Sequence, residues 1–290
     1  MVDFVTASAP LRIDLAGGWT DVPPFPSDFG GEVVNFAINK RVVVRRDLKS
    51  TDYPPEFDFP VPRGSGLGTS SAMYVAISAL SSTKETSGPR IIAEEAYKME
   101  YQSGNLCGRQ DQWASALGGF NHLLFLGDSV EEMPFEPAKS AKNWLKKHLI
   151  ISFSGISRNS GEMQRSVWES YSRGESETLE GLHRIRGAVK PMANGLQQDR
   201  RDMVVTSLGE ICKGVDLINP EIHDPFRSII YPLIDNGSVA AWKALGAGGG
   251  GCSAILCSPF GLDTANKALR NAGWKIIDWD FEDVGVVLEK

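Results

Sequence analysis

The segment PRGSGLGTSSA, residues Pro62–Ala72, places three alternating glycines directly before MYVAISAL, a stretch with the pattern of a helix. Glycine loses much conformational entropy on folding, so its density here indicates a backbone requirement. A helix N-terminus with exposed N–H groups binds anions, and glycine lets a phosphate approach those groups closely. The segment therefore predicts either a phosphate-binding loop or a flexible turn in which Thr69 or Ser70 caps the helix.

The bulk composition is that of an ordinary globular protein. The chain has 290 residues, 42% of them hydrophobic and 23% charged, with a formal net charge of −6, which argues against a nucleic-acid or anionic-membrane surface. MVDFVTASAP lacks a signal-peptide pattern, and no apolar run reaches the roughly 20 residues that span a bilayer. The four cysteines form no CxxC pair and the histidines lie far apart, so we expect neither a disulfide framework nor a zinc site, and a cytoplasmic location.

Strand-like and helix-like patterns alternate along the chain without a clear repeat. Residues 4–18 predict two short strands broken at Pro10, residues 31–47 a hairpin, and residues 48–62 an irregular connector. Helices are expected from the glycine segment to about Leu80, over 89–103 and 109–117, and through most of 160–236. Further strands are expected at 120–127, 148–155 and after the glycines of 245–257. The order predicts an α+β or mixed α/β protein with two lobes.

Three well-known phosphate motifs do not fit the glycine segment. No lysine follows Gly68 as in a Walker loop, and the spacing GxGxG differs from the GxGxxG of dinucleotide-binding folds. The DFG at Asp28–Gly30 precedes the glycine segment, and no HRD follows it, which excludes a protein kinase. Two other segments remain unusual, PLRIDLAGGWTDVPPF and GAGGGG. Three glycine-rich segments spread over the chain predict that distant parts converge on one site.

These segments carry a family resemblance. APLRIDLAGGWTD, PRGSGLGTSSA and LGAGGGGC, in this order, resemble the three motifs of the GHMP kinases, the family of galactokinase, homoserine, mevalonate and phosphomevalonate kinases. LAGGWTDVPPF and GRQDQWASALGGFN resemble the heptose-phosphate and fucose kinase branch, which phosphorylates the anomeric hydroxyl. The resemblance implies an N-terminal ATP-binding lobe, residues 1–147, with a left-handed βαβ unit, and a ferredoxin-like C-terminal lobe, residues 148–290. Residues 22–61 form a shorter stretch than the family has there. The resemblance therefore does not identify the residues that form the wall beside adenine.

The resemblance also implies ATP and Mg²⁺ and assigns the catalytic residues. Asp111 is implied as the base, or as the group that orients the acceptor hydroxyl, and Arg12 as the cation near the transferring phosphate. Ser71 and Glu100, eleven residues before Asp111, are the implied Mg²⁺ ligands. Without the resemblance, we would expect Glu100 to lie on a solvated face of its helix. Asp111 would then be an acidic residue in the first turn of a helix, where it interacts favourably with the helix dipole. The implied ATP-binding residues are Gly64, Ser65, Gly66, Gly68, Thr69, Ser70 and Ser71.

Further residues are implied on the acceptor side. Carboxylates suit vicinal hydroxyls, which favours Asp14 and Asp21, although turn chemistry explains them equally well without the resemblance. Arg158 is expected either to meet a second phosphate on the substrate or to lie on the surface. The implied substrate-binding residues are Asp14, Gly18, Thr20, Asp21, Arg158, Gly248 and Gly249.

These observations favour an ATP-dependent kinase that acts on a sugar or sugar phosphate, with a small-molecule partner and neither nucleic acid nor membrane. A cyclitol kinase of the same family is the alternative, and a homodimer is left open. A non-catalytic sugar- or ATP-binding sensor is a further alternative from another class. The joint presence of Arg12, Ser71, Glu100 and Asp111 argues against that sensor.

Overall fold

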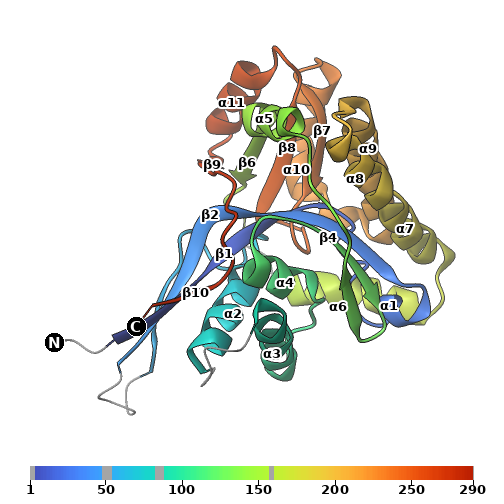
Figure 1. The fold of residues 1–290 in the computed structure, drawn as a ribbon. Coiled ribbons are helices and arrows are strands. Elements are labelled where there is room, and N and C mark those ends of the chain that lie inside the picture. The colour runs from blue at the N-terminus through green and yellow to red at the C-terminus, as the bar shows by residue number, and fades with distance from the viewer. Residues whose placement is uncertain (1–3, 48–53, 82–87, 157–159, 290) are drawn as a thin grey trace.

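The computed structural model describes residues 4–47, 54–81, 88–156 and 160–289, and contains two antiparallel sheets with helices packed on them (Figure 1). The first sheet has the order β10-β1-β2-β4-β5, with β3 paired to β2. Its strands are β1 (Phe4–Ala16), β2 (Gly31–Asp47), β3 (Glu56–Asp58), β4 (Phe120–Leu126), β5 (Ser129–Glu132) and β10 (Val287–Glu289). The chain therefore returns at its C-terminal end to the sheet in which it begins.

The two longest strands differ from the sequence-based expectation. The predicted break at Pro10 is wrong, because β1 continues through this residue. The register of its pairing with β2 shifts between Pro10 and Leu11, which suits a residue without a backbone N–H donor. The prediction of a hairpin in residues 31–47 is also wrong, since β2 is one strand of 17 residues. Asn39, where the turn was expected, instead exchanges hydrogen bonds with Asp280. The expected irregular connector contains the short strand β3.

Helices α2 (Thr69–Ser81), α3 (Pro89–Gln102) and α4 (Gln110–Leu117) confirm the three helices predicted in the N-terminal half. Helices α2 and α4 pack on β1 and β2, and α3 packs outside them (Figure 1). The fully buried Ala72 and Ala76 give α2 a smooth inner face, so its first turn is held close to β1. The short helix α1 (Phe25–Asp28) follows the turn after β1.

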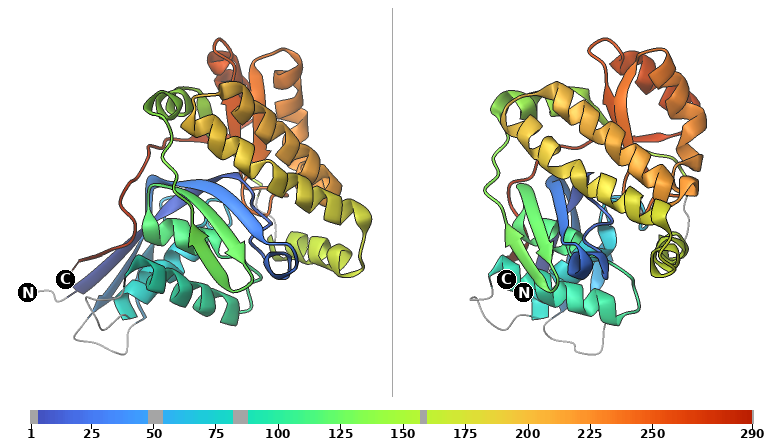
Figure 2. Two further views of the ribbon diagram at one scale, coloured as in Figure 1. Left: turned by 45° about the vertical axis from the view of Figure 1, so that its right-hand side comes forward. Right: turned by 90° about the vertical axis from the view of Figure 1, so that its right-hand side faces the viewer.

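The second sheet has the order β7-β8-β6-β9, formed by β6 (Leu149–Phe153), β7 (Val239–Ala244), β8 (Cys252–Cys257) and β9 (Lys275–Ile277). Helices separate β6 from β7 and β8 from β9, which is the βαββαβ order of the expected ferredoxin-like lobe. Figure 2 shows this sheet and its helices stacked on the first sheet. The helices are α5 (Lys139–His148), α6 (Ser160–Ser172), α7 (Ser176–Gly187), α8 (Val189–Gln197), α9 (Arg201–Ile218), α10 (Asp224–Asp235) and α11 (Leu262–Asn271), with the 3₁₀ helix η1 (Pro220–Ile222).

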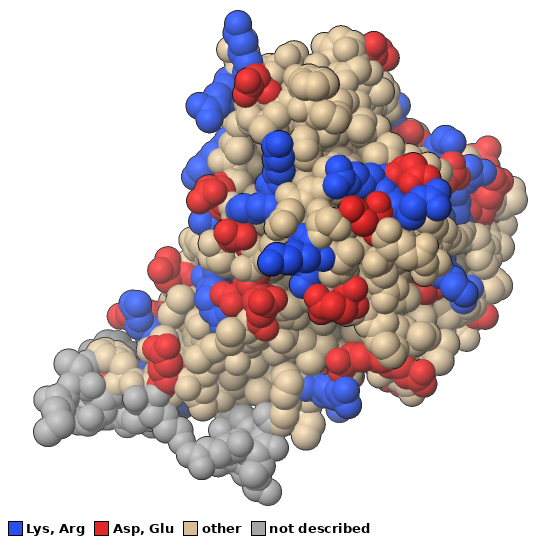
Figure 3. Space-filling model, turned by 45° about the horizontal axis from the view of Figure 1, so that its top comes forward, with Lys and Arg blue, Asp and Glu red and all other residues tan. Residues whose placement is uncertain are grey.

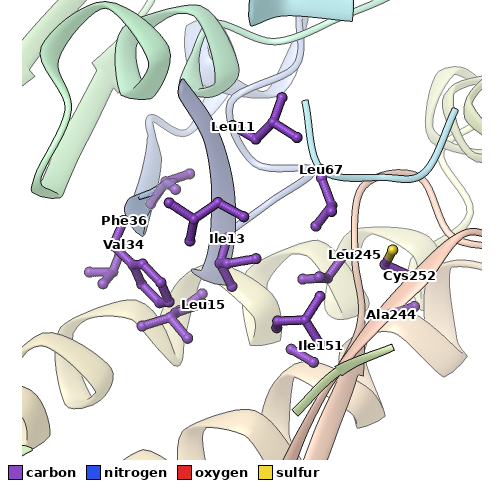
Figure 4. Packing of buried hydrophobic residues seen from close by; sticks show 14 of the residues in the cluster. Leu11, Ile13, Leu15, Val34, Phe36, Leu67, Ile151, Ala244, Leu245 and Cys252 are labelled. Carbon is purple, nitrogen blue, oxygen red and sulfur yellow. The ribbon is translucent and has the colours of Figure 1, made fainter. Parts of the chain in front are cut away.

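One hydrophobic cluster joins the two sheets. Figure 4 shows Leu67 of the glycine segment between Leu11 of β1 and Leu245, which directly follows β7 of the second sheet. Leu67 and Leu245 are both fully buried, and each belongs to a glycine-rich segment. The apolar core therefore fixes the position of these two segments relative to one another.

The outer surface carries charges of both signs. On the face shown in Figure 3, Lys and Arg alternate with Asp and Glu, and the described residues form no extended patch of one sign there. No helix within the described ranges has both the length and the apolar character needed to cross a bilayer.

Candidate active site

A cavity of about 690 Å³ is lined by residues from all three glycine-rich segments. The predicted convergence of these segments is thus present in the structure. The predicted site residues that line the cavity are Arg12, Asp14, Gly18, Asp21, Gly64, Gly66, Gly68, Thr69, Ser70, Ser71, Glu100, Asp111 and Gly248.

Glycine is required where the second and third segments touch. Gly66 has a φ of 81°, and a Cβ atom there would collide with the carbonyl oxygen of Leu245. The backbone N–H of Cys252 donates to the carbonyl of Ser65 at 2.7 Å, which ties the glycine segment to β8. Helix α2 begins at Thr69 directly after this contact, so its N-terminal N–H groups open onto the cavity.

Arg12 and Asp111 form a bidentate ion pair at the cavity wall. Nε and Nη2 of Arg12 donate to the two carboxylate oxygens of Asp111, each at 2.7 Å, and Nη1 donates to the carbonyl of Gly66 at 2.8 Å. Burial by itself lowers the pKa of Arg12, but the charges of Asp111 and Asp14 and the hydrogen bond to Asp111 outweigh it and raise that pKa. Arg12 therefore stays charged, and it joins strand β1, the glycine loop and the first turn of α4.

Glu100 and Ser71 lie together, as the sequence predicted. The Ser71 hydroxyl and the Gln112 amide both donate to Oε2 of Glu100 at 2.7 Å. Glu100 is buried, which raises the pKa of its carboxyl group above the ordinary value. Its position in α3 is thus not the solvated helix face that local pattern alone suggested.

Asp14 is joined to the C-terminal lobe by a buried ion pair. Nζ of Lys243, in β7, donates to Oδ2 of Asp14 at 2.6 Å, and both side chains are about 95% buried. The other carboxylate oxygen, Oδ1, has no hydrogen-bond partner among the described residues. A Cβ atom on Gly18 would collide with Asp14, so glycine at that position makes room for the carboxylate.

Asp21 is held by the start of α4. Its two carboxylate oxygens accept hydrogen bonds from the backbone N–H of Gln110 at 3.0 Å and from its side-chain amide at 3.1 Å. Burial raises the pKa of Asp21 to about 7, and the nearby negative charges of Asp111 and Asp14 act in the same direction. Near neutral pH this group therefore exchanges between a hydrogen-bond acceptor and a donor.

The raised pKa predicts a pH-dependent stability. In the folded chain Asp21 keeps its proton up to about pH 7, whereas in the unfolded chain it loses the proton near pH 3.8. The contribution of Asp21 to the free energy of unfolding is therefore fully present below pH 4 and is lost as the pH rises to 7. Asp21→Asn stays neutral at every pH. We therefore expect the free energy of unfolding of this variant, relative to that of wild type, to rise by at least about 1.4 kcal/mol between pH 5 and pH 8. Chemical unfolding at both pH values measures this. A gain equal to that of the exposed control Asp263→Asn would contradict it.

Three predicted residues hold the site's backbone without lining the cavity. The Thr20 hydroxyl donates to the carbonyl of Gly17 at 2.7 Å and accepts from the N–H of Glu32 at 3.1 Å. Ser65 bonds β8 through its carbonyl, and the N–H of Gly249 donates to Ile222 at 2.9 Å. Arg158, expected at a second phosphate, lies outside the described residues.

Several residues of the site escaped sequence reasoning. Gln110 lines the cavity and binds Asp21, and its sequence signal is its place within GRQDQ. Lys243 binds Asp14, and its only sequence signal is its position just before the third glycine segment. Trp19 lines the cavity with a φ of 84°, which is rare for a bulky side chain. Gln164 and Arg165 of α6 also line it, and nothing in the local sequence marks them.

Comparison with known proteins agrees with this geometry. Residues 38–119 match the family described as GHMP kinases N terminal domain. The chain is 26% identical to a D-glycero-alpha-D-manno-heptose 7-phosphate kinase of Campylobacter jejuni, over 97% of this chain and 98% of that protein. It is 23% identical to a bifunctional fucokinase/GDP-fucose pyrophosphorylase of Arabidopsis thaliana, over 85% of this chain and 29% of that protein.

The fold is similar to a solved structure from Bacteroides thetaiotaomicron, a D-glycero-D-manno-heptose 1-phosphate kinase, with a TM-score of 0.75, 21% identity and 99% coverage of both chains. The three motifs, the two-sheet fold and these matches agree: residues 38–119 match the N-terminal domain of the GHMP kinases, and the chain as a whole is similar to kinases of that kind in sequence and fold.

Proposed function

We propose that this protein is an ATP-dependent kinase that transfers the γ-phosphate of ATP to a sugar or sugar phosphate, at the anomeric hydroxyl. The observation that carries the proposal is the Arg12–Asp111 pair, which lies between the glycine loop and the acceptor-side aspartates in one cavity. The similarity to a heptose 7-phosphate kinase and to a fucokinase supports a sugar acceptor.

The glycine loop and the start of α2 provide the phosphate-binding part. Backbone N–H groups at a helix N-terminus point toward an anion, and the absence of a side chain at Gly68, which faces Arg12 and Asp111 in the cavity, lets phosphate oxygens come close. Arg12 adds a fixed positive charge beside this loop through its bond to the Gly66 carbonyl. Such groups stabilise the charge that spreads over the transferred phosphoryl group without having to reorganise.

Asp111 is the group that we assign to the acceptor hydroxyl. Arg12 occupies one lone pair on each carboxylate oxygen, and the remaining lone pairs are available to accept a hydroxyl proton. The Asp111 side chain is 23% exposed, whereas that of Arg12 is 3% exposed, so the carboxylate is the partner that substrate can reach. Asp14 and Asp21 then hold neighbouring hydroxyls and fix the ring.

Ser71 and Glu100 fit a magnesium site. A hydroxyl and a carboxylate are ligands of the hard oxygen type that Mg²⁺ prefers, and Mg²⁺ commonly takes its remaining ligands from water and substrate phosphates. Glu100 has no cationic partner among the described residues, although it is buried beside the glycine loop. When bound there, the ion would neutralise negative charge on the phosphates of ATP.

Glu100→Gln tests this assignment. Replacing a charged ligand with a neutral amide should raise the Mg²⁺ concentration for half-maximal activity by on the order of tenfold, or about 1.4 kcal/mol of binding. Titration of activity with Mg²⁺ at fixed ATP measures the change. Glu95→Gln, on the exposed side of the same helix, is the matched control, and an equal shift in both variants would remove Glu100 from this role.

A coupled assay for ADP release tests the function itself. Purified protein with ATP and Mg²⁺ is supplied with hexoses, heptoses, their terminal phosphates and cyclitols. We expect activity with a sugar or sugar phosphate. Activity with cyclitols alone would favour the cyclitol alternative, and nucleotide binding without turnover on any acceptor would favour the sensor.

Two further parts of the proposal concern organisation and location. We place the boundary between the ATP-binding lobe, residues 1–147, and the C-terminal lobe, residues 148–290, at the end of α5. The four cysteines are free thiols, which supports a cytoplasmic location.

A further inference from the structure

The positive charges around the cavity divide into two groups. Arg12 is neutralised by Asp111 and Lys243 by Asp14, each at hydrogen-bond distance. Arg63 and Arg165 also line the cavity, and neither has a carboxylate partner within the described part of the chain. Two cations thus remain for ligands that carry negative charge.

Arg63 lies on the nucleotide side. It directly precedes Gly64, the first residue of the glycine loop, and its guanidinium lies 5.3 Å from the ring centre of Phe59. A cation at the beginning of a phosphate-binding loop suits the phosphates of ATP. The phosphates of ATP therefore account for the positive charge of Arg63, and no other anion is needed near it.

Arg165 lies on a different element, helix α6, which is attached to the acceptor side. The Tyr171 hydroxyl of α6 donates to Asp28 of α1 at 2.5 Å, and the Tyr171 and Phe25 rings are 6.3 Å apart. Asp21 and Val22 line the cavity, and helix α1 begins only two residues after Val22. The contact with α1 therefore holds α6 beside the loop that we assign to the sugar.

One face of α6 is turned to the cavity. Gly161, Gln164 and Arg165 all line it, and their spacing of three and four residues places them on the same side of a helix. Gly161 leaves space on this face, while the amide of Gln164 and the guanidinium of Arg165 provide hydrogen-bond donors. The face thus combines the positive charge of Arg165, an exposed side chain, with the neutral donors of the half-buried Gln164.

This chemistry suits a phosphate better than a hydroxyl. Arginine presents several N–H donors in a plane and binds phosphate with two parallel hydrogen bonds, whereas the sugar hydroxyls already have the carboxylates of Asp14 and Asp21. We propose that Gln164 and Arg165 bind a phosphate group carried by the acceptor, so that the acceptor is a sugar monophosphate. This inference rests on the proposed sugar-kinase function and assigns to α6 the choice between a phosphorylated and a neutral sugar.

Calorimetric binding in the absence of ATP tests the inference. The ligands are a heptose 7-phosphate and the same heptose without phosphate, and the proteins are wild type and Arg165→Gln. We expect wild type to bind the phosphorylated sugar more tightly, and the variant to lose on the order of 10- to 100-fold for that ligand, the range for a charge-assisted hydrogen bond. Affinity for the neutral sugar and for ATP should not change.

Arg173→Gln is the matched control, because Arg173 lies one residue beyond α6 and pairs with Glu175 at 2.8 Å. Equal binding of both sugars by wild type, equal losses for both sugars in Arg165→Gln, or a loss confined to ATP would each overturn the inference. Because binding is measured without turnover, these outcomes are distinct from failure of the kinase proposal, which would appear as no ADP release with any sugar.

Discussion

Asp111→Asn should lower kcat by on the order of 10²–10⁴, the usual contribution of a positioned acid–base group, while ATP binding stays close to that of wild type. Asparagine keeps the shape of the side chain but cannot take up the hydroxyl proton. It also leaves Arg12, which is 2% exposed, with its bond to the Gly66 carbonyl and the more distant charge of Asp14. Steady-state kinetics at saturating ATP and acceptor measure the expected loss.

Two controls separate chemistry from folding in this experiment. Asp128→Asn removes an exposed partner of Arg109 and should leave kcat within about twofold, since exposed ion pairs contribute little. Unfolding of Asp111→Asn by urea shows whether the unpaired Arg12 has destabilised the fold. Near-wild-type turnover in a folded Asp111→Asn protein would exclude Asp111 from the reaction.

Lys243→Met should lower the free energy of unfolding by about 3–5 kcal/mol, because it leaves the Asp14 carboxylate buried without its charged partner. The pair joins β1 to β7, so the two lobes lose a link at the cavity as well. Unfolding by urea, followed by tryptophan fluorescence, measures the loss. The acceptor affinity should fall too, since Asp14 would lose the hydrogen bond from Lys243 that holds it in place.

The double variant Asp14→Asn/Lys243→Met decides whether the ion pair is the cause. With both charges removed, no buried charge is left unpaired, and most of the lost stability should return. Lys213→Met, in an exposed pair with Glu210, should cost less than about 1 kcal/mol. If the double variant were as unstable as the sum of its two single variants, the pair would not be the origin of the effect.

The glycine-rich segments allowed the fold and much of the site to be predicted from sequence. The second and third segments touch at a point that only glycine permits, because a Cβ atom on Gly66 would meet the carbonyl oxygen of Leu245. Helix α2 was predicted for the same reason, since the glycines end where a regular pattern begins. Such features are local, so a short stretch of sequence contains them.

Long-range contacts explain what sequence reasoning missed. The expected turn near Asn39 does not form because Asp280, 241 residues later, supplies hydrogen bonds at that point of β2. Lys243 reaches Asp14 across 229 residues, and Arg165 lines the cavity on α6, which a hydrogen bond from Tyr171 to Asp28 connects to α1. Nothing near these residues in the sequence reports a partner so far away.

Phosphorus NMR of the reaction product tests the central claim most directly. The protein is incubated with ATP, Mg²⁺ and the acceptor that gives the highest rate of ADP release, and the new phosphate is observed with coupling to protons. We predict a phosphate coupled to the proton on C1, which is the product expected from the kinase branch that the sequence motifs resemble. A new phosphate on a primary hydroxyl, or activity only on rings without an anomeric carbon, would contradict phosphorylation of a sugar at its anomeric hydroxyl.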